Sequence, residues 1–193
     1  MSYKYIPNIL SIMRIVLTPI FVLLMLLNTF YMKLFALIIF FISSLSDFLD
    51  GYLARKFNYI TEMGKFIDPV ADKVLIVSAF IVLNIFYSNI VQMWMIVAIV
   101  SRDIFITCAR YFFITYYKTS FNTSFLGKFK TLLQIIVIHI ILLFHLYNPA
   151  LINNFTFFSF NLIYVLMIVC VAFTVCSGLH YLYINFLNNS NES

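Results

Sequence analysis

Six long apolar stretches, separated by short polar segments, constrain this chain more than any other feature. They run over about residues 9–27, 34–49, 69–87, 90–113, 132–147 and 157–186. A bilayer core about 30 Å thick needs about 20 helical residues, so the second and fifth stretches must borrow flanking residues. The stretches are continuous and do not alternate with period two, which favours helices over strands. The sequence therefore predicts an all-α integral membrane protein, a bundle of six transmembrane helices.

Composition excludes several other classes of protein. Of the 193 residues, 64% are hydrophobic and 10% are charged, whereas soluble domains have about 25% charged residues. Too few polar residues are present to cover a surface exposed to water, so no nucleic acid is expected as a partner despite the formal net charge of +5. We expect a single membrane-embedded domain over residues 1–193, surrounded by a lipid bilayer and without a removable signal peptide.

The basic residues predict the orientation of the bundle. Six spans place both termini on one side of the membrane. The connections on the other side carry Lys33 alone, whereas those on the side of the termini carry Lys4, Arg55, Lys56, Lys65, Lys118, Lys128 and Lys130. Cytoplasmic connections are enriched in Lys and Arg. Both termini are therefore predicted to face the cytoplasm, in the cell membrane.

Five of the seven acidic residues lie between positions 47 and 72, on the same predicted side, and four of them are aspartates. Asp47 and Asp50 are three residues apart, and Asp68 and Asp72 are four apart, so each pair shares one helix face. Four neighbouring carboxylates repel one another unless cations neutralise them. Oxygen-only ligands favour Mg²⁺, Mn²⁺ or Ca²⁺ over zinc. The pattern predicts a site for two divalent cations, suited to displacement at phosphorus, in a cavity that faces the cytoplasm.

The same stretch holds the small residues Gly51, Ala54 and Gly64, which let a ligand or another helix approach the backbone closely. Residues 47–72 read D-x2-D-G-x2-A-R-x8-G-x3-D-x3-D. This motif resembles that of the CDP-alcohol phosphatidyltransferase family without departure. The resemblance implies that the site binds two divalent cations, Mg²⁺ or Mn²⁺, together with the CDP part of a lipid donor. It also implies a homodimer.

The resemblance implies a role for each motif residue. The metal ligands would be Asp47, Asp50, Asp68 and Asp72, and Asp72 would in addition be the general base for the acceptor hydroxyl. The CDP pocket would be lined by Gly51, Ala54, Arg55 and Gly64. Asn8, near the start of the first span, is a further candidate for contact with the nucleotide.

Further segments resemble the bacterial phosphatidylglycerophosphate synthase branch of the family, namely residues 6–14, 68–73, 101–103, 109–110 and 127–134. They imply phosphatidyl transfer from CDP-diacylglycerol to sn-glycerol 3-phosphate, which releases CMP. Asp103 departs from the pattern, because Glu is expected there. The predicted pocket for the acceptor phosphate comprises the cations Arg102, Arg110, Lys128 and Lys130. An Arg inside a membrane needs a partner, and Asp103 or an acid of the motif is expected to pair with Arg102.

Two alternatives remain open at this stage. The acceptor alcohol could be inositol phosphate or serine, with the same chemistry. A cation transporter could use the aspartates as its ion site. Such transporters favour charges at the bilayer midplane and often have repeated halves. In this chain the acids lie at the ends of apolar stretches and the halves are unlike.

Overall fold

The structure is a computed structural model, which describes residues 6–57, 62–117, 125–147, 149, 152, 156–157 and 160–190. Side chains are described for residues 11–46, 70–109, 129–147 and 161–181, and at a few isolated positions. Among the sequence-predicted site residues, the described side chains are Asp72, Arg102 and Lys130. The others lie outside the described side chains.

The described part of the chain is helical apart from one short hairpin. Its helices are α1 (Ile6–Leu27), α2 (Phe30–Phe57), α3 (Glu62–Phe86), α4 (Met93–Tyr117), α5 (Phe125–Tyr147) and α7 (Leu162–Ser190). The hairpin pairs β1 (Thr156–Phe157) antiparallel with β2 (Phe160–Asn161), with Phe157 opposite Phe160. Each predicted apolar stretch thus lies largely within a helix, and the all-α prediction is confirmed.

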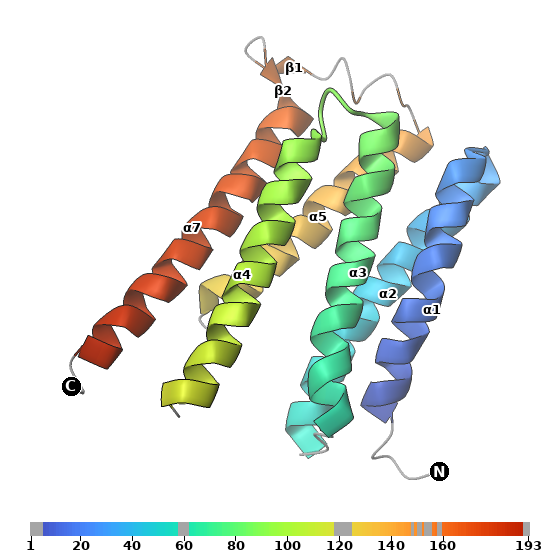
Figure 1. Cartoon of the computed structure of the whole chain (residues 1–193). Coiled ribbons are helices and arrows are strands. Elements are labelled where there is room, and N and C mark those ends of the chain that lie inside the picture. The colour runs from blue at the N-terminus through green and yellow to red at the C-terminus, as the bar shows by residue number, and fades with distance from the viewer. Residues whose placement is uncertain are drawn as a thin grey trace.

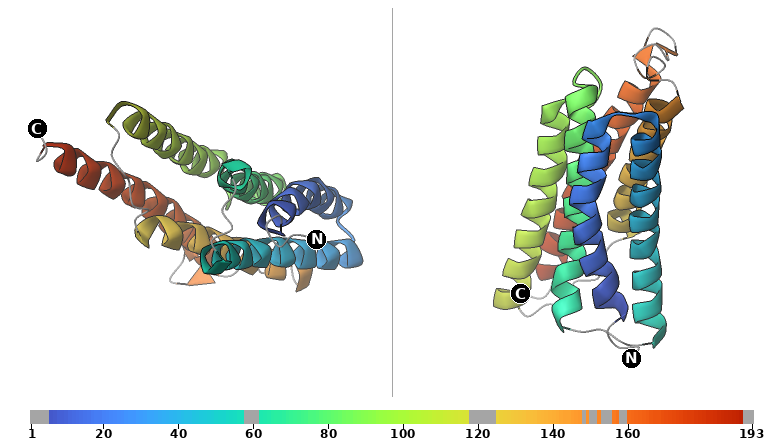
Figure 2. Two further views of the ribbon diagram at one scale, coloured as in Figure 1. Left: turned by 90° about the horizontal axis from the view of Figure 1, so that it is seen from below. Right: turned by 90° about the vertical axis from the view of Figure 1, so that its right-hand side faces the viewer.

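The helices run alternately up and down, so α1 begins and α7 ends at the same end of the bundle (Figure 1). Viewed along the helices, α1, α3 and α4 form one layer and α2, α5 and α7 form the other (Figure 2). Within and between the layers, α1 packs on α2 and α3, and α7 packs on α4 and α5. The end of α2 and the start of α3, which carry the two halves of the motif, lie at the end of the bundle where α1 begins (Figure 1).

The helix boundaries differ from the marked apolar stretches at three places. The second stretch, marked over 34–49, was expected to need flanking residues, and α2 extends to Phe57, through the first half of the motif. A polar surface ends an apolar stretch without ending a helix, because the backbone hydrogen bonds continue and one glycine costs only about 1 kcal/mol. At the other end of the bundle, α4 begins at Met93, three residues later than expected, and α7 begins at Leu162 because the hairpin occupies the expected start of the last span.

Asparagine residues define two of the helix boundaries. Asn28 has a left-handed backbone (φ 54°) and its N–H donates to the carbonyl of Met25 at 3.2 Å, which ends α1. Asn161 caps α7, because its Oδ1 accepts hydrogen bonds from the N–H groups of Ile163 at 3.0 Å and Tyr164 at 3.2 Å. Both caps lie at the end of the bundle away from the motif.

Beside an apolar core, the described part of the bundle buries several polar side chains and exposes many large apolar ones, which is unusual for a soluble protein. The buried polar group is Ser11, Arg14, Thr18, Ser43, Lys130, Gln134, His145, Thr174 and Ser177. Large apolar side chains such as Leu23, Phe105 and Leu179 are about 60% exposed (62%, 60% and 62%). In the described part, Phe129–Tyr147 and Leu162–Tyr181 are long and apolar enough to cross a membrane, and Ser11–Leu27 and Phe30–Ser46 are shorter apolar helices. These features are those of a membrane protein.

Aromatic and histidine side chains fill the interior of the bundle. The rings of Phe21 and Phe40 pack with their centroids 5.5 Å apart, and Phe40 also contacts His139 at 4.9 Å. At the end of α3, the hydroxyl of Tyr87 forms a 2.5 Å hydrogen bond with Nδ1 of His145. His145 is thus buried and His139 partly buried, and both have packing partners inside the bundle.

Candidate active site

The two halves of the motif come from adjoining helices. The backbone of α2 carries Asp47, Asp50, Gly51, Ala54 and Arg55, and that of α3 carries Gly64, Asp68 and Asp72. The end of α2 and the start of α3 lie at the same end of the bundle (Figure 1). Because only Asp72 has a described side chain, the convergence of four carboxylates stays a prediction. Within the described residues, no three His, Cys, Asp or Glu side chains group as a metal site would require.

Asp72 is held from the first helix. Its carboxylate forms an ion pair with the guanidinium of Arg14 on α1, whose side chain is 1% exposed, while that of Asp72 is 26% exposed. The carboxylate of Asp72 is thus bound to α1 through Oδ1 and remains exposed enough to contact a ligand.

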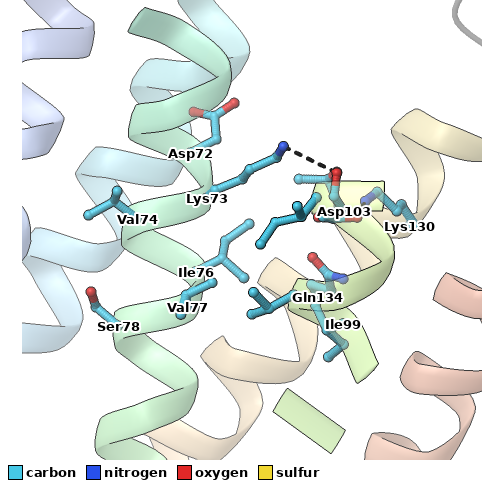
Figure 3. A pocket seen from close by; sticks show the side chains of 13 residues that line it. Asp72, Lys73, Val74, Ile76, Val77, Ser78, Ile99, Asp103, Lys130 and Gln134 are labelled. Carbon is cyan, nitrogen blue, oxygen red and sulfur yellow. Dashed lines mark hydrogen bonds and ion pairs between the residues drawn. The ribbon is translucent and has the colours of Figure 1, made fainter. Parts of the chain in front are cut away.

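A cavity of about 490 Å³ opens between α3, α4 and α5, beside Asp72. Its polar lining consists of Asp72, Lys73, Ser78, Asp103, Lys130, Thr131 and Gln134, and its remaining lining is aliphatic. Figure 3 shows Lys73 extending from α3 toward α4, with Asp103 and Lys130 on the far wall. A volume of this size is that of a small-molecule site, and each of its two facing walls carries one acidic and one basic side chain.

Asp103 organises the cations on the far wall. Its Oδ1 accepts a hydrogen bond from Nη1 of Arg102 at 2.9 Å and forms an ion pair with Nζ of Lys130. The predicted partnership of Arg102 with an acid is thereby confirmed. Lys73 reaches the same place from α3, because its Nζ donates to the backbone oxygen of Asp103 at 3.5 Å and to Oγ1 of Thr107 at 2.7 Å.

The last helix supports this cluster, although sequence reasoning found nothing specific in it. Nη2 of Arg102 donates to Oγ of Ser177 at 2.9 Å. A Cβ at Gly178 would lie 2.8 Å from Nε of Arg102, so any larger residue there would force the Arg102 side chain to shift. One turn away along α7, Oγ1 of Thr174 accepts from Nε2 of Gln134 at 3.2 Å. The sequence signal that could have indicated this contact was a glycine next to a serine in an apolar helix, Ser177 and Gly178.

The predicted acceptor pocket is reproduced only in part by the described side chains. Lys130 lines the cavity as expected. Arg102 does not line it and instead lies behind Asp103, against α7. The side chains of Arg110 and Lys128, like that of Asn8, lie outside the described residues. Lys73 was missed as a cavity residue, although a Lys in an apolar span always needs polar partners.

An all-helical membrane bundle that carries an acidic motif on two consecutive helices, beside a cavity lined by aspartates and lysines, fits a membrane enzyme that acts on a charged substrate. A model of the CDP-alcohol phosphatidyltransferase family matches residues 4–176, and the chain belongs to this family. The match continues into α7, well beyond residue 134, where the resemblance seen in the sequence ended.

Curated relatives make the comparison more specific. A CDP-diacylglycerol–glycerol-3-phosphate 3-phosphatidyltransferase of Bacillus subtilis is 35% identical over 187 residues, which are 91% of this chain and 92% of the relative. A protein of the same name from Rickettsia typhi is 35% identical over 140 residues, covering 72% of this chain and 77% of the relative. Another from Escherichia coli K12 is 34% identical over 134 residues, with coverage of 69% and 74%.

Proposed function

We propose that this protein transfers the phosphatidyl group of CDP-diacylglycerol to sn-glycerol 3-phosphate, giving phosphatidylglycerophosphate and CMP. The observation that carries the proposal is the similarity to the Bacillus subtilis relative across nine tenths of both chains. The cavity supports it further, because an acceptor that bears a phosphate needs cations close to the base that activates its hydroxyl. Lys130 and Asp72 line the same cavity and meet that requirement.

We assign the metal site to Asp47, Asp50, Asp68 and Asp72. Their donor set is all oxygen, which fits two Mg²⁺ or Mn²⁺ ions. The backbone positions of the two pairs, at the end of α2 and in α3, support a shared site. Bound there, the ions would neutralise charge on the phosphates of the donor.

The protein's own groups supply the remaining chemistry. Asp72 accepts the proton of the primary hydroxyl of the acceptor. The oxygen attacks the phosphorus that bears diacylglycerol, a new O–P bond forms, and the bond from that phosphorus to the oxygen of CMP breaks. Gly51, Ala54, Arg55, Gly64 and Asn8 line the CDP pocket in this proposal. The acceptor phosphate is bound by Lys130 with Arg110 and Lys128, and Arg102 acts from behind through Asp103.

The proposal includes the placement of the protein in the cell. The six helices each cross the membrane, residues 1–193 form one domain, and both termini and the active site face the cytoplasm. The asymmetry of Lys and Arg between the two ends of the bundle supports this orientation. The acyl chains of the donor then stay in the bilayer while its head enters the cavity. A homodimer is part of the proposal through the family resemblance alone.

The test uses purified full-length protein in detergent with CDP-diacylglycerol, Mg²⁺ or Mn²⁺, and a panel of alcohols, with CMP release as the readout. We expect release with sn-glycerol 3-phosphate to exceed that with serine, inositol or inositol phosphate. Preference for one of these other alcohols would overturn the acceptor assignment. Asp72→Asn should abolish CMP release while the protein remains folded, and full activity in that variant would overturn the assignment of the base.

A further inference from the structure

Lys73 is a cavity residue to which neither the motif nor the predicted acceptor pocket gives a role. It directly follows Asp72 on α3, and consecutive helical residues point about 100° apart. Asp72 therefore meets Arg14 on α1, whereas Lys73 crosses the cavity toward α4 (Figure 3). The two side chains lie on adjacent sides of the space in which the proposed reaction takes place.

The hydrogen bonds of Lys73 leave its charge uncompensated within the described part of the chain. An ammonium has three N–H donors, and the described acceptors of Lys73 are two neutral oxygens, the carbonyl of Asp103 and the hydroxyl of Thr107. The Asp103 carboxylate is occupied by Arg102 and Lys130. One N–H of Lys73 thus has no acceptor among the described residues, in a partly buried site where a charge favours an anionic partner.

The charges around the cavity show what kind of anion fits. The described ionic side chains in and directly behind its wall are the cations Arg14, Lys73, Arg102 and Lys130 and the anions Asp72 and Asp103. Four positive and two negative groups leave a net charge of +2. A phosphate monoester carries about −1.5 to −2 at neutral pH, which matches this excess of positive charge among the described side chains.

We propose that Lys73 binds the phosphate of the acceptor together with Lys130, one ammonium from α3 and one from α5. This inference rests on the proposed function and adds a residue to it. Because Lys73 follows the general base directly on one helix and both side chains line the same cavity, the bound phosphate lies within reach of the hydroxyl that Asp72 activates. An alcohol with a phosphate a few bonds from its hydroxyl is selected over one without a phosphate.

The test compares Lys73→Met, which removes the charge and keeps the length, with Lys73→Arg, which keeps the charge. Lys33→Met is the matched control, because it removes a cation at the opposite end of the bundle, at the start of α2. In CMP-release assays of the full-length protein, Lys73→Met should raise the KM for sn-glycerol 3-phosphate about tenfold or more, as expected for a lost charge-assisted hydrogen bond. The KM for CDP-diacylglycerol should change less than twofold, and Lys33→Met should behave as the parent.

A larger rise in the KM for CDP-diacylglycerol than for the acceptor would assign Lys73 to the donor and overturn the proposal. An unchanged acceptor KM in a parent protein that does use sn-glycerol 3-phosphate would overturn it as well, and would leave the proposed function intact. Failure of the parent protein to use that acceptor would refute the proposed function instead.

A binding measurement keeps the inference testable without turnover. Inorganic phosphate, added to the full-length protein without substrates, should raise the midpoint of thermal unfolding of the parent. The phosphate concentration for half of this effect should rise about tenfold or more in Lys73→Met and much less in Lys73→Arg. Where Lys73→Met does not fold, Lys73→Gln serves in its place. Equal protection of the parent and the uncharged variant, or no protection of the parent, would refute the assignment.

Discussion

Asp103 joins two cations that have no other acidic partner among the described side chains, and its replacement tests the polar interior of the bundle most directly. Its carboxylate is 15% exposed, and its partners Arg102 and Lys130 are 12% and 9% exposed. Breaking a buried ion pair by removing one partner costs about 3–5 kcal/mol, because the charge left behind is neither paired nor solvated. For Asp103→Asn we therefore expect a loss of unfolding free energy of about this size.

The expected loss converts into a thermal shift. In a chain of this length, 1 kcal/mol changes the unfolding midpoint by about 2–4 °C, so Asp103→Asn should lower it by about 6–20 °C. The measurement is thermal unfolding of the purified protein in mild detergent, followed by circular dichroism. CMP release by the folded fraction should fall as well, because Lys130 loses the partner that holds it at the cavity wall.

Two control variants separate charge from packing. Asp103→Glu keeps the carboxylate and should retain most of the midpoint. A variant that combines Asp103→Leu with Arg102→Met and Lys130→Met removes all three charges, and it should recover much of the lost stability because apolar replacements of a whole buried ion cluster are often neutral or stabilising. A midpoint for Asp103→Asn within about 2 °C of the parent would refute the reasoning, since the two cations would then need no buried partner.

Three further changes have expected outcomes. Gly178→Ala should lower the free energy of unfolding by about 1–3 kcal/mol, and with it the unfolding midpoint, because the added methyl group displaces Arg102 from Ser177. The control is Ala172→Ser, at an exposed position of α7, for which no change of the midpoint is expected. Tyr87→Phe should cost about 1–3 kcal/mol in the same measurement, because it leaves the buried His145 without its partner, and CMP release per folded molecule should stay at the parental level. Removal of divalent cations by a chelator should abolish CMP release, and Mg²⁺ or Mn²⁺ should restore it; activity that survives chelation would contradict the assigned metal site.

Much of the fold could be predicted from the sequence because the helices of a membrane protein are long apolar stretches of sequence. Because only 10% of the residues are charged, the aspartates of the motif stand out in the sequence. Their spacing predicted a site formed by consecutive helices. Helix ends were predicted less well, since hydropathy marks the membrane boundary and not the last backbone hydrogen bond. The extension of α2 to Phe57 and the late starts of α4 and α7 follow from this difference.

The cavity itself could not be predicted, because it depends on residues far apart in the chain. Spacing alone predicts that Asp72 and Lys73 are neighbours, but not that one meets Arg14 on α1 while the other meets α4. It likewise gave no reason to expect that Ser177 and Gly178 on the last helix would seat Arg102.

The sequence by itself determined the all-helical membrane architecture, the acidic motif and the family, because each follows from a local pattern of apolar, acidic or small residues. Only the tertiary structure decided which charges meet. Asp103 pairs with Lys130, 27 positions away, and Lys73 joins them from a third helix. The physical reason is that buried charges must be compensated across helix interfaces, and the packing of the helices decides which partners lie within reach.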